Sequence, residues 1–443
     1  MRLRTLAALA AAALPLAAHA TDGYFAHGYG MKAKGMGGAS VAVAQDAFGG
    51  ANNPATMAFV VNQFAIGVDL FSPSRSAERS GSPPGAGLDG SVDSGSKYFG
   101  IPEIGYNYMV RPDLALGVTV YGNGGMNTDY PGGQIPGASA CQGFYPGQSS
   151  YNLLCGTGNL GVDLSQLVIA PTLAWKFAPN HAIGIAPLWA YQRFKAYGLQ
   201  AFDNPMLSTS PGSVTNNGYD NSSGWGVRVG YYGQFTPQFA VGASYSTKIS
   251  MGDFGKYQGL FAQSGGFDIP ANWSLGIAFK PTTQWLLAFD YERIEYGDVP
   301  SINNAANLLL QCLGGNRSAC LGGPSGAGFG WQSVNVYKLG AQYEIDPQWT
   351  VRAGYNYTDN PIQPADVTPN IIAPGVVQNH LTLGATYSWD KKNEITGAFM
   401  YAFNNSVQGA SLFNNFFPPP QPNMQERIEM DQWSLGVQWA YKF

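Results

Sequence analysis

Few residues of this sequence have the types and spacing that catalysis requires. Beyond the first twenty residues, the histidines are His27, His181 and His380. An acid–base or nucleophilic site needs such a side chain within hydrogen-bond reach of a second reactive group. A hydrolase at a membrane edge would need a histidine and a serine on neighbouring outward positions, whereas His380 is followed by Leu381 and Thr382. His181 falls in an expected turn, so the sequence argues against an enzyme.

The four cysteines lie as two local pairs, each within a stretch rich in Gly, Ser and Asn: Cys141 with Cys155, and Cys312 with Cys320. In an oxidising compartment such pairs are expected to be disulfides that close loops. A zinc site would need closer cysteine spacing or nearby histidines. The glycines of 28–30 are similar to part of a dinucleotide loop, but no strand precedes them. We expect two disulfides, with free thiols as the alternative, and no metal or cofactor.

The N-terminus predicts export. Arg2 and Arg4 precede an apolar run at 6–16 and then Ala18-His19-Ala20, which is the order of a secretory signal peptide. We therefore expect residues 1–20 to be removed and the mature chain to begin at Thr21.

The composition of the remaining chain limits the classes of protein to which it can belong. No later stretch approaches the ~18 consecutive apolar residues that a membrane-spanning helix needs. Charged residues are 11% of the chain, against about 25% in ordinary soluble domains, and the 58 glycines are nearly double the usual share of about 7%. The net charge of -4 provides no basic surface for nucleic acid. A secreted soluble protein and a transmembrane β-barrel remain.

Periodicity favours the barrel. The C-terminal stretch WSLGVQWAYKF places large apolar side chains on one parity and small or polar ones on the other. This period-two alternation, with the large apolar face outward, is typical of strands that face lipid. The same pattern recurs at 114–121, 225–231, 273–279, 337–345, 351–357, 381–387 and 395–403.

Turn signals divide the chain into hairpins. Short connections are expected at 111–113, 178–180, 236–238, 280–282, 346–348 and 390–392. Longer loops are expected at 76–96, 129–162, 199–221, 252–267, 299–330, 360–375 and 406–426. The count is about fourteen strands, an even number as in bacterial barrels, with short turns and both termini on the periplasmic side. The fold class is therefore all-β: a transmembrane antiparallel barrel over residues 62–443.

Parity also predicts which charges face the lumen, since a lysine or arginine facing lipid at the bilayer midplane costs roughly 2 to 4 kcal/mol. The charges expected to point inward are Glu103, Arg228, Lys248, Asp290, Glu292, Lys338 and Arg352. Buried charges usually pair with one another, so a network that holds an internal segment is preferred. The alternative is a cation that receives a ligand carboxylate.

The segment TDGYFAHGYGMKAKGMGGASVAVAQDAFGGANNPATMAF resembles the N-terminal region of the FadL family of outer-membrane transporters for long-chain fatty acids and other hydrophobic compounds. The matching features are the glycine-rich 35–39 stretch, Asp46-Ala47 and above all Asn53-Pro54-Ala55. The resemblance implies a monomeric fourteen-stranded barrel whose lumen is closed by an N-terminal hatch, here residues 21–61. It also implies passive uptake: ligand captured outside, passed to an inner pocket gated by the hatch, and released sideways through a kinked third strand.

Two parts of this mechanism fall on particular residues. In the family the third and fourth long loops form the outer groove, and here those loops carry Leu199, Phe202, Met206, Leu207, Phe254, Leu260 and Phe261. Exposed apolar clusters often mark binding sites, although these residues could instead close the barrel mouth. Gly122, Gly124 and Gly125 on the third strand predict a bulge at the lateral exit, or simply the end of that strand.

The remaining expectations concern the hatch, assembly and partners. Asn53-Pro54 predicts a rigid corner that anchors the hatch to the wall, with a plain turn as the alternative. The alternating aromatic residues Trp439, Tyr441 and Phe443 resemble the signal read by the outer-membrane assembly machinery. The expected partners are a fatty acid or hydrocarbon ligand, outer-membrane lipid and lipopolysaccharide, and that machinery. A general porin for polar solutes and a surface adhesin are the rival functions.

Overall fold

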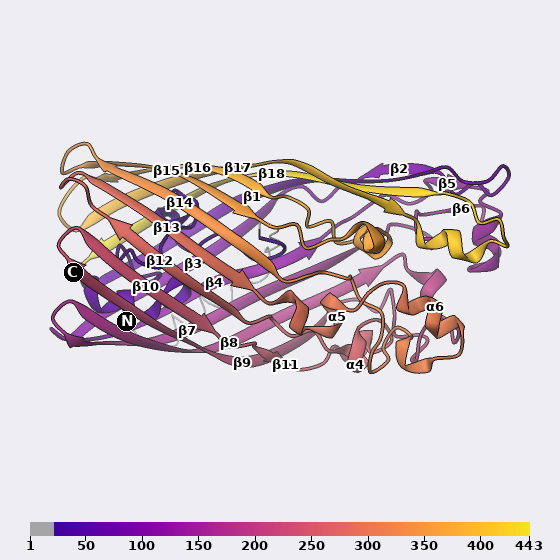
Figure 1. Ribbon diagram of the computed structural model, residues 1–443, viewed down its shortest axis with the longest axis horizontal. Helices are drawn as coiled ribbons and strands as arrows, with labels where there is room; N and C mark the ends of the chain where they lie inside the picture. Colours follow the sequence, from indigo (N-terminus) through magenta and orange to yellow (C-terminus); the bar gives the residue numbers. More distant parts are fainter. Residues whose placement is uncertain (1–21) are drawn as a thin grey trace.

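The computed structural model describes residues 22–443, in which fourteen strands close into one antiparallel barrel (Figure 1). The predicted signal peptide, residues 1–20, lies outside the described residues. The strands of the wall are β1 (Gln63–Ser80), β3 (Phe99–Arg111), β4 (Leu114–Asn127), β7 (Gly161–Ala178), β8 (His181–Tyr197), β9 (Asp220–Thr236), β10 (Phe239–Ser246), β12 (Asn272–Phe279), β13 (Trp285–Ile294), β14 (Val334–Glu344), β15 (Trp349–Thr358), β16 (Asn379–Ser388), β17 (Asn393–Ala410) and β18 (Gln425–Lys442). The barrel closes where β1 pairs with β18, so the predicted fold class is confirmed.

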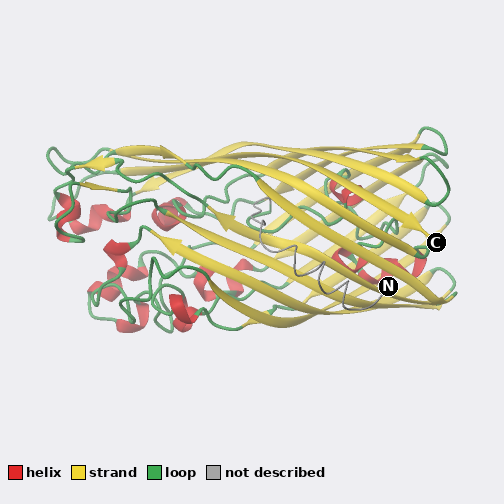
Figure 2. Ribbon diagram, turned by 180° about the vertical axis from the view of Figure 1, so that it is seen from behind, coloured by secondary structure: helices red, strands yellow, loops and turns green. Residues whose placement is uncertain are grey.

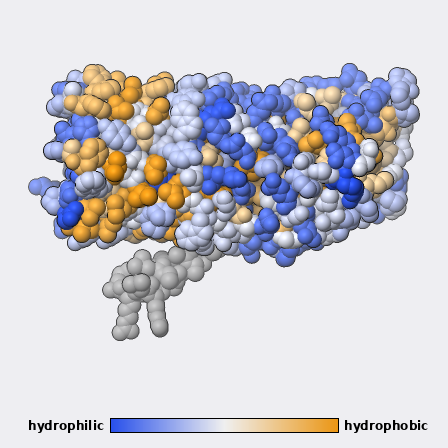
Figure 3. Space-filling view, turned by 60° about the horizontal axis from the view of Figure 1, so that its bottom comes forward, coloured by the Kyte–Doolittle hydropathy of each residue, from blue (hydrophilic) through white to orange (hydrophobic). Residues whose placement is uncertain are grey.

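On the face seen in Figure 3, apolar side chains gather over the part of the barrel nearer the short turns. In β1, for example, Ile66, Val68 and Leu70 are exposed while Ala65 and Asp69 between and beside them are buried. This alternation is what a strand with one face toward lipid requires. Among residues 22–443, no helix is long and apolar enough to cross a membrane.

The six expected short turns join strands at one end of the barrel, here called the short-turn end, where the C-terminus also lies (Figure 1). The opposite, long-loop end carries most of the helical turns, and the others lie inside the barrel (Figure 2). Its elements are β2 (Gly90–Asp93), β5 (Ile135–Pro136), η2 (Ala140–Gly143), β6 (Ser150–Tyr151), η3 (Gln200–Phe202), β11 (Ser250–Met251), η4 (Gly255–Tyr257), α4 (Ala262–Gly265), η5 (Tyr296–Asp298), α5 (Pro300–Asn303), α6 (Leu308–Leu313), η6 (Arg317–Ala319), η7 (Pro364–Asp366), α7 (Val367–Asn370) and η8 (Leu412–Phe416).

Two strands are longer than the sequence predicts. The loops expected to begin at 76 and 406 start later, because β1 continues to Ser80 and β17 to Ala410. The final residues of both strands pair with β18, so hydrogen bonding extends them where the apolar alternation has ended. The wall therefore rises beyond the apolar band, and the long loops fold above it.

The N-terminal segment, residues 22–60, lies inside the barrel (Figures 1 and 2). It contains α2 (Met31–Lys34), α3 (Gly49–Asn52) and the 3₁₀ helix η1 (Pro54–Phe59), and nearly all of its residues are buried. Small residues allow it to approach the wall. A Cβ atom on Gly242 of β10 would lie 2.0 Å from the carbonyl oxygen of Val41. Glycine in the wall thus makes room for the backbone of the internal segment.

Candidate functional site

An apolar cavity lies among the long loops and is here called the outer cavity. It contains about 690 Å³ of atom-free space, part of it open to solvent. Its lining is Leu154, Val162, Phe194, Leu199, Phe202, Leu260, Phe261, Ser301, Ala306, Leu309, Leu321, Ala327, Gly328, Phe329, Thr368, Pro369, Ile372 and Leu412. The two hydroxyl groups already donate elsewhere, Ser301 to the carbonyl oxygen of Gly266 and Thr368 to the carboxylate of Glu426. The cavity therefore suits the hydrophobic part of a ligand.

The structure places four of the seven expected capture residues in this lining: Leu199, Phe202, Leu260 and Phe261. Two others lie behind it. Phe254 packs on Phe194 and Phe261, with ring centroids 5.6 and 5.9 Å away. Leu207 belongs to a neighbouring apolar cluster with Leu309 and Leu321. Met206 is different, because it is 62% exposed and does not line the cavity.

Sequence reasoning missed the contribution of the loop at 299–330. Leu309 and Leu321 come from this loop, which the disulfide Cys312–Cys320 and side-chain hydrogen bonds help to place. The disulfides Cys141–Cys155 and Cys312–Cys320 are present, as predicted. Arg317, inside the second disulfide loop, donates to the carbonyl oxygens of Pro205 at 2.5 Å and Ser208 at 2.9 Å. The leucine run at 308–310 was the available signal.

Asp366 connects the loop at 299–330 with the loop at 360–375. Its carboxylate accepts a hydrogen bond from the backbone N–H of Ala306 at 2.7 Å. Burial raises the pKa of Asp366, and the bond from Ala306 acts in the opposite direction with smaller effect. This carboxyl group thus joins two walls of the outer cavity.

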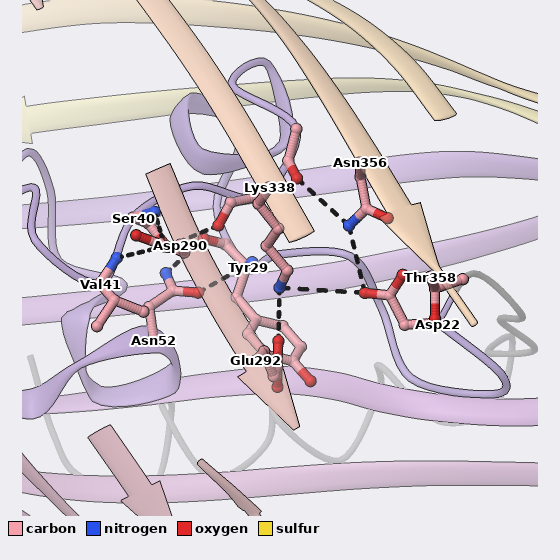
Figure 4. A network of polar contacts seen from close by, with 12 residues as sticks. Asp22, Tyr29, Ser40, Val41, Asn52, Asp290, Glu292, Lys338, Asn356 and Thr358 are labelled. Atoms are coloured by element: carbon pink, nitrogen blue, oxygen red, sulfur yellow. Dashed lines mark hydrogen bonds and ion pairs between the residues drawn. The ribbon is translucent and has the colours of Figure 1, made fainter. Parts of the chain in front are cut away.

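Below the loops, charged side chains of the wall bind the N-terminal segment (Figure 4). Lys338 lies 2.6 Å from Glu292 and 4.0 Å from Asp22. Asp290 accepts hydrogen bonds from the backbone N–H groups of Ser40 at 2.6 Å and Val41 at 2.8 Å. Paired charges and bonded carboxylates are how buried ionic groups are normally stabilised.

Two further wall charges bind the same segment. Glu103 accepts from the N–H of Gly30 at 3.1 Å and lies 3.6 Å from Lys34. Arg228 donates to the carbonyl oxygens of Gly50 and Ala51, at the end of α3. Each of these wall charges therefore contacts either an opposite charge or backbone groups of the N-terminal segment.

Arg352 and Lys248 do not bind the N-terminal segment. Arg352 is buried and donates to Gln342 at 2.8 Å and Thr386 at 2.7 Å, both in the wall. The lumen assignment of Lys248 is wrong. It lies beyond the end of β10, its side chain is 41% exposed, and it pairs with Asp268 at 2.8 Å. Parity has no meaning there because the strand ends at Ser246.

The Asn53-Pro54-Ala55 corner lies against the wall at a pair of glycines. Gly184 of β8 and Gly230 of β9 are directly opposite in the ladder. A Cβ atom at Gly230 would lie 2.0 Å from the side-chain oxygen of Asn53, and one at Gly184 would lie 2.4 Å from Pro54. No larger residue fits at either position without displacing the corner.

The third strand of the wall, β4, stops pairing with its neighbour β3 before β4 itself ends. The β3–β4 ladder runs from Arg111 and Leu114 to Ile104 and Val120, and no ladder pair of the described residues joins the two strands beyond it. Residues 121–127 of β4, facing residues 99–103 of β3, are here called the unpaired wall segment. The β4–β7 register shifts between Gly122 and Gly124, which is a bulge at the predicted glycines.

The N-terminal segment bonds to β4 at this place. The N–H of Ala26 donates to the carbonyl oxygen of Asn123, and the N–H of Gly125 donates to that of Tyr24, both at 3.2 Å. A Cβ atom at Gly124 would lie 1.8 Å from the Tyr24 carbonyl oxygen. Two backbone groups of β4 beyond the end of the β3–β4 ladder are therefore bonded from inside the barrel.

Residues 7–443 match the family described as outer membrane protein transport protein (OMPP1/FadL/TodX). The chain belongs to this family. The family resemblance of the N-terminal sequence is thereby confirmed, and the chain is an outer-membrane protein of the Gram-negative type. The family consists of transport channels, and among residues 22–443 no group of His, Cys, Asp and Glu side chains could hold a metal ion.

Solved structures show the same barrel. The toluene transporter TodX of Pseudomonas putida is similar with a TM-score of 0.66 and 18% identity, covering 96% of this chain and 100% of that one. The toluene transporter TbuX of Ralstonia pickettii has a TM-score of 0.62, 17% identity and coverage of 94% and 99%. A FadL homologue of Pseudomonas aeruginosa has a TM-score of 0.65, 15% identity and coverage of 95% and 100%. None of the curated proteins is similar enough in sequence to match the chain.

The C-terminal aromatic residues lie at the short-turn end of β18. Trp439 and Phe443 are exposed. The ring centroid of Tyr441 lies 6.3 Å from that of Trp439 and 6.1 Å from that of Phe443. They form one outward aromatic row, and their role as an assembly signal stays a prediction.

Proposed function

We propose that the protein takes up hydrophobic compounds by passive passage from the outer cavity through the barrel interior to the unpaired wall segment. The observation that carries this proposal is the combination of two features: an apolar cavity above the barrel, and a stretch of wall in which β3 and β4 form no ladder pairs among the described residues. A ligand that enters from water gains roughly 25 cal/mol for each Å² of apolar surface it buries. Release into the bilayer then needs no energy source.

In this proposal the N-terminal segment is the hatch. It occupies the barrel interior and bonds to β4 at the bulge, so it must shift before ligand can reach the unpaired wall segment. The short-turn end faces the periplasm, where both termini lie, and the long loops face outward. The chain acts as a monomer, in contact with lipid and lipopolysaccharide, after assembly through its C-terminal aromatic row.

The outer cavity provides the test. Replacing Leu260 and Phe261 by serine should reduce cellular uptake of a radiolabelled hydrophobic compound severalfold, because both side chains line the cavity. Met206→Ser is the matched control, since Met206 is exposed and does not line it. Equal uptake by all three proteins would contradict the proposal.

Conductance separates this function from a general porin. With the N-terminal segment in place, single-channel conductance in a planar bilayer should be low. Large stable conductance steps for wild-type protein would favour passage of polar solutes instead. Loss of cell attachment in the Leu260 and Phe261 variant, with unchanged uptake, would favour an adhesin.

A further inference from the structure

The outward face of β8 changes in chemical character along the strand. Gln192 donates to the carbonyl oxygen of Phe267 at 2.9 Å, and Phe194 lines the outer cavity, so these two side chains point inward. The residues that alternate with them point outward. From the short turns toward the long loops, this outward row is Ile183, Ile185, Pro187, Trp189, Tyr191, Arg193 and Lys195. The row is therefore apolar first, then aromatic and then cationic.

The aromatic residues of the row mark the level of the membrane interface. Trp225 of β9 is directly opposite Trp189 in the ladder and is 66% exposed. Transmembrane barrels carry aromatic girdles at their interfaces. Arg193 is the next outward residue beyond Tyr191, which places it roughly 7 Å farther along the strand and, at a tilt of about 40°, roughly 5 Å higher. Its charge therefore lies at the level of the lipid headgroups.

Arg193 and Lys195 share one aromatic neighbour, Tyr219, which lies just before β9. The centroid of its ring is 4.6 Å from Cζ of Arg193 and 4.8 Å from Nζ of Lys195. A further cation, Lys256 of η4, donates from Nζ to the backbone carbonyl oxygen of Tyr219 at 2.7 Å. Arg193, Lys195 and Lys256 are here called the cationic cluster. Their positive side chains surround a single residue on the outside of the barrel.

The carboxylates near the cationic cluster are bonded to other groups. Asp163 is directly opposite Lys195 in the β7–β8 ladder, but it accepts a hydrogen bond from the hydroxyl of Tyr219 at 2.5 Å. Asp220 accepts from the backbone N–H of Lys256 at 2.8 Å. Lys195 takes part in none of the ion pairs of residues 22–443. An anionic group from outside the protein would therefore reduce the repulsion among the clustered cations.

Other outward rows carry different charges at this level. In β18, the outward residues that follow Trp433 toward the long loops are Asp431 and Glu429. In β13, the outward Arg293 pairs with Glu295 at 3.3 Å. An anionic headgroup would be repelled at β18 and would compete with a carboxylate at β13. The β8 row differs from both because it presents two successive outward cations.

We infer that the cationic cluster binds a phosphate group of lipid A, the acylated glucosamine disaccharide that anchors lipopolysaccharide in the outer leaflet. The phosphates of lipid A are monoesters, which carry nearly two negative charges at neutral pH and offer three acceptor oxygens. Such a phosphate accepts hydrogen bonds from the guanidinium fork of Arg193 and from Nζ of Lys195. The acyl chains of the same lipid lie against Trp189 and the apolar residues of the row.

Lipid A is thereby assigned to one side of the barrel, which rests on the outward orientation of the long loops in the proposed function and not on uptake. The phosphate also holds Lys256, which lies in the loop at 252–267. This loop supplies Leu260 and Phe261 to the outer cavity. A bound lipid therefore orders one wall of that cavity.

The binding test compares lipid A with its dephosphorylated form. Wild-type protein in a neutral detergent is titrated with each lipid, and the bound lipid is measured by native mass spectrometry. Arg193→Gln combined with Lys195→Gln should weaken lipid A at least tenfold, the usual effect of losing bonds to a charged group, and should leave the dephosphorylated lipid unaffected. Phosphatidylglycerol, a phosphate diester with one negative charge, should bind wild type severalfold more weakly than lipid A does.

The matched control combines Arg293→Gln with Arg427→Gln, because these arginines also lie on the outside of wall strands and each pairs with a carboxylate. It removes the same number of charges and should bind lipid A as wild type does. Retained heat-dependent gel mobility shows that both double variants are folded.

Three results would overturn the inference. The first is equal binding of lipid A by wild type and both double variants. The second is equal weakening of lipid A and its dephosphorylated form in the variant of Arg193 and Lys195. The third is equal affinity of wild type for lipid A and for either comparison lipid.

Hydrogen exchange tests the participation of Lys256, whose backbone N–H is bonded to Asp220. Lipid A should slow exchange at this N–H severalfold in wild type and leave it unchanged in the variant of Arg193 and Lys195. Equal exchange in wild type with and without lipid A would exclude Lys256 from the site.

Uptake separates this inference from the proposed function. If lipid A binds as expected while the variant of Leu260 and Phe261 takes up ligand as wild type does, only the transport function fails. If that variant loses uptake while lipid A binding does not depend on Arg193 and Lys195, only the lipid A site fails.

Discussion

The side-chain nitrogen of Asn53 donates a hydrogen bond of 2.8 Å to the backbone carbonyl oxygen of Tyr231 in β9. The same nitrogen donates to Val41 at 2.8 Å, and the side-chain oxygen accepts from the N–H of Ala55 at 3.1 Å. Asn53 therefore caps the N-terminus of η1. Its bond to Val41 joins two parts of the N-terminal segment, and its bond to Tyr231 connects this segment to the wall. The polar capacity of one amide is used in three directions, which a plain turn would not require.

We expect Asn53→Ala to loosen the N-terminal segment without unfolding the barrel. The variant loses the cap of η1, worth about 1 kcal/mol, and two further hydrogen bonds worth roughly 0.5 to 1.5 kcal/mol each. Amide exchange over η1 should be at least tenfold faster, with uptake changed and the heat-dependent gel mobility of the barrel retained. Asn404→Ala, at an exposed position bonded to Glu429, is the control. If exchange and uptake both stayed at wild-type levels, the corner would be only a turn.

Gly124→Ala should detach the N-terminal segment from β4. The added methyl group would lie 1.8 Å from the Tyr24 carbonyl oxygen, so one of the two backbones must move. Exchange at the N–H of Ala26 should rise and single-channel conductance should increase. Gly397→Ala, also in a wall strand, is the matched control because the nearest atom to its Cβ would be 3.9 Å away. Equal behaviour of the two variants would show that the contact with β4 does not hold the segment.

The sequence was most informative where a strand crosses the apolar band. Leu339 is exposed and Lys338 beside it is buried, as alternation predicts, because lipid on one side and a polar interior on the other select opposite residues. The same rule failed at Lys248, since alternation does not reveal where a strand stops. It also missed the end of β1, where Arg79 lies, because pairing with β18 continues there without exposed apolar residues.

The outer cavity depends on contacts between distant loops. Leu321 reaches the outer cavity through a bridge to Ser208, and Thr128 binds the carbonyl oxygen of Ile372. Such pairings follow from the closed barrel, which brings the loop ends together, and no local pattern encodes them. The apolar composition of the third and fourth loops predicted part of the lining, while the remaining walls come from loops whose sequences gave weaker signals.

Lys338→Met should destabilise the barrel interior strongly. It leaves the buried carboxylate of Asp22 and the partly buried carboxylate of Glu292 without their cation, and breaking a buried pair costs about 3 to 5 kcal/mol. Urea unfolding in liposomes, followed by tryptophan fluorescence, measures the loss. Adding Glu292→Gln should recover part of it, because one stranded charge is removed. A double variant no more stable than the single one would show that the ion pair contributes little.

Asp366→Asn should remove a pH dependence from the stability of the junction between the loops at 299–330 and 360–375. Because burial raises the pKa of Asp366 in the folded protein, the folded state favours the protonated form. Its contribution to stability is fully present below the unfolded pKa of about 3.9 and is lost as the pH rises through the folded value. Exchange at the N–H of Ala306, corrected for the intrinsic rate, should therefore accelerate over that range in wild type and stay level in the variant. Asp253→Asn, at an exposed loop position, should behave as wild type. Parallel profiles for all three proteins would exclude Asp366 as the cause.

Leu309→Trp should fill the outer cavity and block it. Leu309 is 5% exposed and lines the cavity, whereas Leu313 of the same helix α6 is 43% exposed and does not. Leu313→Trp is therefore a control of identical chemistry four residues away. The cavity variant should bind a hydrophobic ligand at least tenfold more weakly and take it up more slowly, and the control should do neither. Because α6 lies above the wall, both variants should keep the thermal stability of the barrel. Equal binding by the two variants would mean that ligand enters the barrel without passing through the outer cavity.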